Sequence, residues 1–354
     1  MLAGMLNPLK SRPVEVAKGP VVRTIFTLPR RVLERLAGTP VVIDGKTLDT
    51  EMQLILKLQK AEGPHLATLP IVEGRREVVT GSRLVGGSPA VGSVSDRTIA
   101  GPAGDLQLRI YTPTGVTGAV PTLLFVHGGG WIYGDLESHD AICRFFAERS
   151  GVRVVAVDYR LAPEHPFPAA YDDVWASYEW LLEHAAEIGI DTDRIAVGGD
   201  SAGGNLATAI AQTAVREGVT APAFQLLIYP ATDFVETRPS RHSFGEAFFL
   251  TREFIDLAKK SYTLSNPDPA DPRLSPLRGT LRGMPPAYLV TAGFDPLLDE
   301  GKEYADMLRE AGVQVEYRCE EGLIHSFANM VSLGSSAPAA MARAAEALRR
   351  ALFG

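Results

Sequence analysis

Ser201 is the residue of this chain whose surroundings best suit a nucleophile. It lies in the middle of GDSAG, between an apolar run at 195–197 that predicts a buried strand and an apolar pattern from Leu206 that predicts a helix. In a GxSxG motif at such a junction, a strained turn exposes the serine oxygen. Gly199 and Gly203 suit this turn, because a Cβ at either position would collide with the neighbouring strand or helix. The motif is short, so the interpretation requires an oxyanion site, a base and an acid elsewhere in the chain.

A run of three glycines is the second group of residues suited to this chemistry. HGGGW at 127–131 directly follows the apolar run 123–126, so it lies where a predicted strand ends. Successive glycines let backbone NH groups approach an oxygen that becomes negative in a tetrahedral intermediate. The NH group of Ala202, at the positive end of the following helix, favours the same charge. An unstructured glycine loop is the alternative interpretation, and the strand that ends here argues against it.

Two histidines follow Ser201 in the chain and are candidates for the general base. In this strand–turn–helix architecture the order is serine, acid, histidine, and the last two lie on loops after later strands. His242 lies before any strand that ends in a candidate acid, whereas His325 follows a predicted strand at 313–319. We therefore predict that His325 is the base.

Two aspartates compete for the role of the acid. Asp295 directly follows AYLVTAGF, which predicts a strand, so its carboxylate is placed to hold the imidazole tautomer and to stabilise its charge. Asp299 lies about one helical turn further along and is better placed to open the helix that contains Tyr304 and Leu308. We therefore predict that Asp295 is the acid and that Asp299 is structural.

Three other polar residues in these motifs are predicted to have structural roles. His127 precedes the serine, so we expect it to hold the glycine loop by hydrogen bonds rather than to act as a base. Glu164 is expected to pair with a nearby arginine, and Asp200 is expected to have a structural role.

The elements that must position these residues alternate between strands and helices. Such alternation predicts an α/β fold with a mostly parallel sheet of about eight strands flanked by helices, and it places ligands at the carboxyl ends of the strands. The first two strands, which a GPAG turn joins, are expected to be antiparallel. The predicted strands are 94–100, 106–112, 121–126, 152–157, 195–197, 224–228, 287–291 and 313–319.

The chain divides into two parts on this interpretation. Residues 1–93 are expected to form a helical cap segment and a linker, with one helix at 50–62 and a boundary rich in glycine and serine at 80–93. Residues 94–354 are expected to form the catalytic domain. Within it, the alternation of strands and helices breaks at about 234–285, which we interpret as a cap insertion forming part of a lid.

Composition excludes several classes of protein. The 354 residues are 45% hydrophobic and 22% charged, as in an ordinary globular chain, and the net charge of −7 argues against a nucleic acid partner. Cys143 and Cys319, the only two cysteines, allow neither a disulfide framework nor a four-cysteine metal site. No motif for a metal or a dinucleotide is present, so no cofactor is expected.

The first 47 residues carry an excess of basic side chains over acidic ones. This segment could contact an anionic membrane surface, but the alternative of a solvated helical face is favoured because no cluster of bulky aromatic residues accompanies the charges. No run of 18 apolar residues and no secretory signal is apparent, so a cytoplasmic location is expected.

The motifs together resemble those of the bacterial hormone-sensitive lipase family of α/β-hydrolases. HGGGWIYGD, DYRLAPEHPFPAAYDD, GGDSAGGNL, GFDPLLDEG and the HSF that begins at His325 occur in that family's order. The resemblance implies that the oxyanion is bound by the backbone NH groups of Gly129, Gly130 and Ala202. It also assigns the acid to Asp295, the aspartate of DPL. The region before 94 resembles the family only as a helical cap.

The resemblance implies a serine carboxylic ester hydrolase that acts on small-molecule esters with short to medium acyl chains. The substrate pocket would include Trp131, Phe248, Phe249 and Leu250. Alternatives are a hydrolase of amides or acetylated sugars, a lipase active at lipid interfaces, and a receptor without catalysis, against which His325 argues. Family members often pair their last strand across a twofold axis, so the strand at 313–319 suggests a homodimer.

Overall fold

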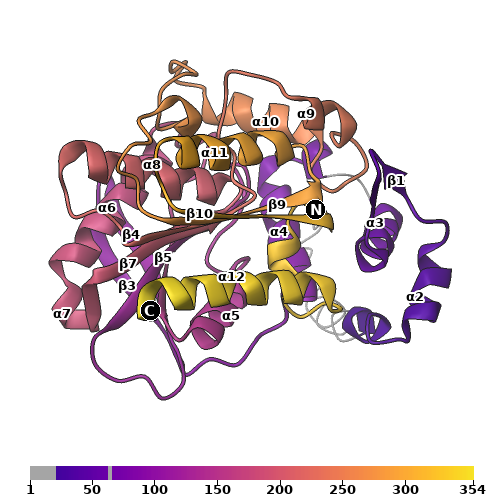
Figure 1. Ribbon diagram of the computed structural model, residues 1–354, viewed down its shortest axis with the longest axis horizontal. Helices are drawn as coiled ribbons and strands as arrows, with labels where there is room; N and C mark the ends of the chain where they lie inside the picture. Colours follow the sequence, from indigo (N-terminus) through magenta and orange to yellow (C-terminus); the bar gives the residue numbers. More distant parts are fainter. Residues whose placement is uncertain (1–20, 63–65) are drawn as a thin grey trace, which may run out of the picture.

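A mixed sheet of eight strands forms the centre of the computed structural model, which describes residues 21–62 and 66–354 (Figure 1). The strand order is β10-β9-β8-β7-β5-β6-β4-β3. All neighbouring strands are parallel except the pairs β3–β4 and β4–β6, which are antiparallel. The α/β class, the number of strands and the antiparallel start are therefore confirmed. The strands are β3 Ser93–Gly101, β4 Gly104–Thr112, β5 Val120–Val126, β6 Arg153–Val157, β7 Ile190–Asp200, β8 Phe224–Ile228, β9 Ala287–Phe294 and β10 Val315–Ile324.

Helices cover both faces of the sheet because its central strands are apolar on both sides. In β5, Leu123 and Phe125 belong to one core cluster, and Leu124 and Val126 belong to the other. Helices α5 and α12 contribute to the first cluster, and α6, α8 and α11 contribute to the second, so they form two layers around the sheet (Figure 1). These helices are α5 Asp140–Ser150, α6 Ala169–Glu183, α8 Ala202–Glu217, α11 Leu298–Glu310 and α12 Ser336–Phe353, and the short α7 spans Ala185–Ile188.

The segment before the sheet contains two features that differ from the prediction. Between helices α2 (Arg30–Ala37) and α3 (Thr50–Glu62), a small hairpin forms from β1 (Val42–Ile43) and β2 (Lys46–Thr47), where only helix was expected. Asp44 and Gly45 at its tip have φ of 49° and 75°, a conformation that suits these residue types and turns the chain within two residues.

The predicted linker at 80–93 is the second difference, because its first half is helical. Helix α4 spans Ile71–Gly86 and follows the short η1 (Leu66–Thr68). A Cβ at Gly86 would lie 2.7 Å from the Cβ of Ala141, so glycine lets α4 approach α5 closely. Gly87, with φ of 65°, then ends the helix. The residues that suggested a flexible boundary thus serve helix packing.

Helix α3 is tied to the core by a buried carboxylate. Glu51, which is 8% exposed, accepts hydrogen bonds from the NH groups of Ser335 and Ser336 at 2.9 and 3.0 Å. These donors lie at the start of α12, where helix NH groups lack partners within the helix and an anion is favourable. In Figure 1, α2, α3 and β1 lie to the side of the sheet layers.

The insertion between β8 and β9 folds as two helices with an irregular segment between them. They are α9 (Pro239–Ser243) and α10 (Arg252–Tyr262), and both lie within the predicted cap insertion at about 234–285. The hydroxyl of Thr251 accepts a hydrogen bond from the Phe254 NH group at 3.3 Å and so caps α10. The short helices η2 (Pro276–Arg278) and η3 (Phe327–Asn329) complete the fold. In the described part of the chain, none of the helices combines the length and the apolar character needed to span a bilayer.

Candidate active site

Ser201 lies in a strained turn between β7 and α8. Its φ of 54° and ψ of −117° are unusual for a residue with a side chain. A Cβ atom at Gly199 or at Gly203 would overlap the carbonyl oxygen of Val126 at the end of β5. Glycine at these two positions therefore allows the turn to lie against the neighbouring strand, as the sequence analysis expects.

The structure brings Ser201, His325 and Asp295 into one hydrogen-bonded chain. Ser201 Oγ lies 2.9 Å from His325 Nε2, and His325 Nδ1 lies 2.7 Å from Asp295 Oδ2. Because an ionised carboxylate only accepts, Nδ1 carries the proton and Nε2 is free to accept the serine proton. Asp295 is fully buried, and its second oxygen accepts the Leu297 NH group at 2.8 Å, which fixes the carboxylate.

Neither rival residue of the sequence analysis is part of this hydrogen-bonded chain. Asp299 lies in the first turn of α11, and its Oδ2 accepts the NH group of Ser240 at 2.8 Å. His242 is exposed on α9. Asp299 therefore has the structural environment that was expected of it, and it links α11 to the insertion.

Tyr229 supports the histidine loop and was not selected from the sequence. It follows β8 directly, its ring lies 4.4 Å from that of His325, and its hydroxyl accepts the Ala328 NH group at 3.2 Å. Burial raises the pKa of Tyr229 well above its ordinary value, so its phenol stays neutral. Its place at the carboxyl end of a central strand is the signal that could have identified it.

Hydrogen bonds to the side chains of Asp200 and His127 hold the glycine loop in place. Asp200 Oδ1 accepts the Gly128 NH group at 2.9 Å and lies 3.2 Å from His139 Nε2. Burial acts to raise the pKa of Asp200, but His139 and the Gly128 NH group outweigh it and lower the pKa below its ordinary value. His127 donates from Nδ1 to the Gly128 oxygen at 2.9 Å and stacks on Tyr159. Burial lowers the pKa of His127 to about 4, so it is a neutral part of the loop, as predicted.

Three backbone NH groups next to Ser201 remain available for a ligand. Those of Gly129, Gly130 and Ala202 donate to no acceptor within residues 21–62 and 66–354. The two glycines have φ of 118° and 63°, which permits the sharp turn of the loop. Ala202 is the first residue of α8, where the NH group has no acceptor in its own helix. The three NH groups predicted as oxyanion donors thus have no acceptor in the described part of the chain.

A narrow pocket that is partly open to solvent lies over Ser201. Its roof is α10 and its sides come from loops that follow β5, β8 and β9. The lining residues are Gly130, Trp131, Ser201, Ala231, Asp233, Phe234, Arg241, Leu250, Phe254, Ile255, Ala258, Lys259 and Leu297. Leu250, Ile255 and Leu297 also pack together as a separate apolar cluster.

The residues that line the pocket differ in part from those predicted. Trp131 and Leu250 line it, but Phe248 and Phe249 do not. Phe248 packs instead between Phe244 and Phe294, with ring centroids 5.9 and 5.2 Å away, because the irregular segment turns it toward the sheet core. Helix α3 also contributes no lining residue, since it packs at the start of α12. The roof comes from α10, whose Phe254 was not selected from the sequence.

The described residues include no cluster of metal ligands and no thiol suited to attack a substrate. No group of three or more histidine, cysteine, aspartate or glutamate side chains there is arranged to hold a metal ion. Cys143 is buried, which raises the pKa of its thiol well above the ordinary value, and burial also raises that of Cys319. Both cysteines are therefore unsuited to act as nucleophiles.

Comparison with known proteins gives consistent similarities. A family model described as the α/β hydrolase fold matches residues 123–329. The carboxylic ester hydrolase LipN of Mycobacterium tuberculosis is 44% identical over 338 residues, which are 93% of this chain and 89% of that protein. The ethyl acetate hydrolase of Pseudomonas putida is 38% identical over 288 residues, which are 79% of this chain and 90% of that protein. The solved structure of an ester hydrolase from the metagenome of Lake Arreo aligns with a TM-score of 0.84 at 42% identity, covering 87% of this chain and 100% of that chain.

Proposed function

The chain belongs to the hormone-sensitive-lipase-like group of the α/β-hydrolase family and is a carboxylic ester hydrolase, and we propose that Ser201, His325 and Asp295 are its catalytic triad. The observation that supports this assignment is the hydrogen-bonded chain from Ser201 Oγ through His325 to a buried carboxylate. We further propose that residues 94–354 form the catalytic domain, that residues 1–93 form a cap segment and linker, and that the insertion at 234–285 roofs the pocket.

Acylation begins when Ser201 Oγ attacks the ester carbonyl carbon and transfers its proton to His325 Nε2. The charge of the imidazolium is stabilised by the carboxylate of Asp295. The carbonyl oxygen becomes negative and accepts hydrogen bonds from the NH groups of Gly129, Gly130 and Ala202, each of which is expected to contribute about 10²–10³ in rate. The alcohol then leaves with the proton of His325. A water molecule then gives a proton to His325 and attacks the acyl carbon. The bond between that carbon and Ser201 Oγ breaks, Oγ regains the proton from His325, and the acid is released.

We propose that the pocket favours acyl chains of about four to eight carbons. Each buried methylene contributes roughly 0.8 kcal/mol, so kcat/KM should rise with chain length until the pocket is full. Leu250, Ile255 and Leu297 are buried and packed against one another, which supports an early limit. A chain that exceeds this limit would have to displace the cluster.

A series of p-nitrophenyl esters from acetate to palmitate tests the function and the chain length together. We expect a maximum between butyrate and octanoate, and a shift toward longer esters in Leu250→Ala, whereas Phe249→Ala should leave the maximum unchanged because Phe249 is not a lining residue. A p-nitroanilide and an acetylated sugar test the amide and sugar alternatives, and Ser201→Ala is the blank. A rate that still climbs at palmitate and jumps above the critical micelle concentration would identify an interfacial lipase, with the basic N-terminal segment as the membrane contact.

We also propose a cytoplasmic homodimer that pairs through β10. This strand lies at one edge of the sheet, and Glu316 and Arg318 alternate with the less exposed Val315 and Tyr317 along it. Light scattering at micromolar concentration should show twice the chain mass of 38.1 kDa. A species of the chain mass alone would contradict the dimer, and recovery of the native protein in the membrane or secreted fraction would contradict the location.

A further inference from the structure

The pocket over Ser201 contains charged side chains that ester hydrolysis does not use. Arg241 and Lys259 line the same cavity as Ser201, together with Asp233. A pocket for a plain acyl chain would be apolar, because a cation removed from water without a partner is unfavourable. Binding of a plain acyl chain therefore does not explain the charged side chains at this site.

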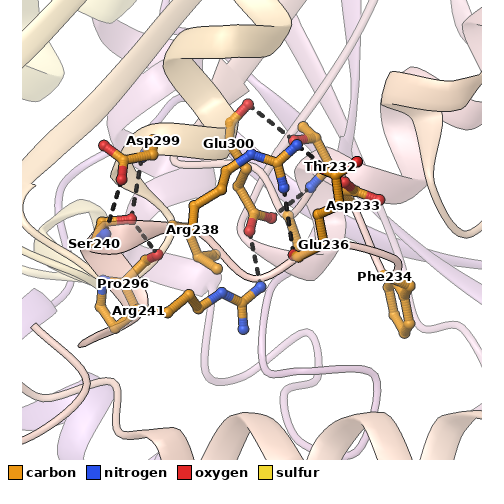
Figure 2. Close-up of polar contacts among 12 residues, drawn as sticks. Thr232, Asp233, Phe234, Glu236, Arg238, Ser240, Arg241, Pro296, Asp299 and Glu300 are labelled. Carbon is orange, nitrogen blue, oxygen red and sulfur yellow. Dashed lines mark hydrogen bonds and ion pairs between the residues drawn. The ribbon is translucent and has the colours of Figure 1, made fainter.

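The two carboxylates near these cations already have partners. Asp233, whose side chain is fully buried, lies 3.0 Å from Arg238 and 2.8 Å from Arg278. Glu300, which is 1% exposed, accepts from Arg241 at 2.8 Å and from the Thr232 NH group at 2.9 Å. Figure 2 shows Arg238 and Arg241 reaching these acids from the segment around α9.

Lys259 has no such partner. Its ammonium donates to the Phe234 carbonyl oxygen at 3.0 Å and lies 5.1 Å from the centre of the Phe234 ring. Within the described ranges, no carboxylate oxygen lies within 4.0 Å of it. An ammonium has three donors, so this contact leaves hydrogen-bonding capacity toward the cavity. Burial and the nearby Arg241 lower the pKa of Lys259, and the charges of Glu300, Asp233 and Asp256 only partly oppose this shift.

Arg241 has an unsatisfied donor as well. Its Nη2 binds Glu300, but its Nε is buried and has no hydrogen-bond partner. Buried polar groups are normally paired, and an orphaned donor in a binding pocket is a position for a ligand acceptor. Two neighbouring cations thus each have capacity that the protein does not use.

The unpaired cation lies close to the reacting atoms. Phe254 and Ala258 of α10 pack over Gly130, because a Cβ at Gly130 would lie 2.9 Å from the Cβ of Ala258. Lys259 is the next residue of the same helix, and Ile255 lies one turn before it on the same face. Because Lys259, Gly130 and Ser201 line one pocket, a group held by Lys259 would share that pocket with the ester carbonyl at Ser201.

We propose that this pocket selects esters that carry a carboxylate, which the side chains of Lys259 and Arg241 bind. The carboxylate supplies the counter-ion that Lys259 lacks and an acceptor for the Nε of Arg241. It lies either in the acyl part, as in the half-ester of a short dicarboxylic acid, or in the alcohol part. The inference rests on the proposed role of Ser201 and adds the substrate class.

The test compares charged and neutral esters of equal length. One arm measures kcat/KM for mono-p-nitrophenyl glutarate against p-nitrophenyl valerate, and the other measures 4-acetoxybenzoate against phenyl acetate. In Lys259→Met we expect the charged-to-neutral ratio to fall by about tenfold or more in the arm that matches the carboxylate's position. Lys259→Arg should retain most of the ratio. The control is Lys260→Met, an exposed neighbour on α10, which should leave the ratio at the wild-type value.

A second measurement does not require turnover of a charged ester. Free glutarate should inhibit hydrolysis of p-nitrophenyl valerate competitively in the wild type, and its inhibition constant should rise by about tenfold in Lys259→Met. Unchanged ratios in both arms, together with an unchanged inhibition constant, would overturn the carboxylate site. That result is distinct from failure of the proposed function, which would appear as full activity in Ser201→Ala. Circular dichroism of each variant confirms that the compared proteins are folded.

Discussion

Replacing Asp295 by asparagine tests the assignment of the acid most directly. The carboxylate is fully buried, its Oδ2 lies 2.7 Å from His325 Nδ1, and its Oδ1 accepts the Leu297 NH group. If the asparagine oxygen keeps the Leu297 bond, its NH₂ group faces Nδ1. His325 must then accept at Nδ1 and carry its proton on Nε2, which can no longer take the proton of Ser201.

The wrong tautomer and the lost charge together should lower kcat by about 10⁴, a value measured for the equivalent change in a serine protease and equal to about 5.5 kcal/mol at the transition state. The assay is kcat/KM for p-nitrophenyl butyrate over a range of pH. Asp299→Asn is the matched control, because Asp299 contacts Ser240 of the insertion and not His325. A larger loss in Asp299→Asn than in Asp295→Asn would transfer the role of the acid to Asp299.

Three further results are expected. Ser201→Ala and His325→Ala should each lower kcat by about 10⁴–10⁶, and the double variant should be hardly worse because the residues act as one unit; more than about a tenth of wild-type turnover in either would contradict its role. Gly203→Ala should yield little folded protein, since its Cβ would overlap the Val126 carbonyl oxygen, and normal yield with full activity would refute that requirement. The free energy of unfolding should fall as the pH decreases from about 6.5 to about 4, since the unfolded state binds a proton at His127 that the folded state excludes. Urea unfolding should show a smaller fall in His127→Asn, and an equal fall would contradict this origin.

A structural feature could be predicted from the sequence where a local contact permits only one residue type. GDSAG lies between a strand and a helix, and its glycines are required by the contact with Val126, so the turn could be recognised without coordinates. The order of strands also favoured His325 over His242 and Asp295 over Asp299, and the two favoured side chains lie within hydrogen-bond distance of each other. For each of these residues, its position relative to a predicted strand indicates at which end of that strand the side chain lies.

The pocket could not be predicted in the same way, because its walls depend on tertiary contacts of an irregular segment. Phe248 and Phe249 are as apolar as Phe254, and only the backbone between α9 and α10 decides which of them face the cavity. Lys259 lies beside Lys260 in a helical pattern, where both residues suggest a solvated face. Lys259 differs from Lys260 because it contacts Phe234. The hydrophobic periodicity of the helix cannot predict this contact, because Phe234 lies outside the helix.

A contact between the insertion and the loop at 295–297 links substrate specificity to the position of Asp295. The Ser240 hydroxyl donates to the carbonyl oxygen of Pro296, the residue directly after Asp295, at 2.8 Å. Leu297, one residue further, is also part of the pocket wall. Substitutions that reshape the insertion for another substrate are therefore expected to shift the backbone next to Asp295, the proposed acid. In evolving or engineered lineages, changes of substrate range in this region should carry a cost in turnover, and compensating mutations should accumulate around 295–297.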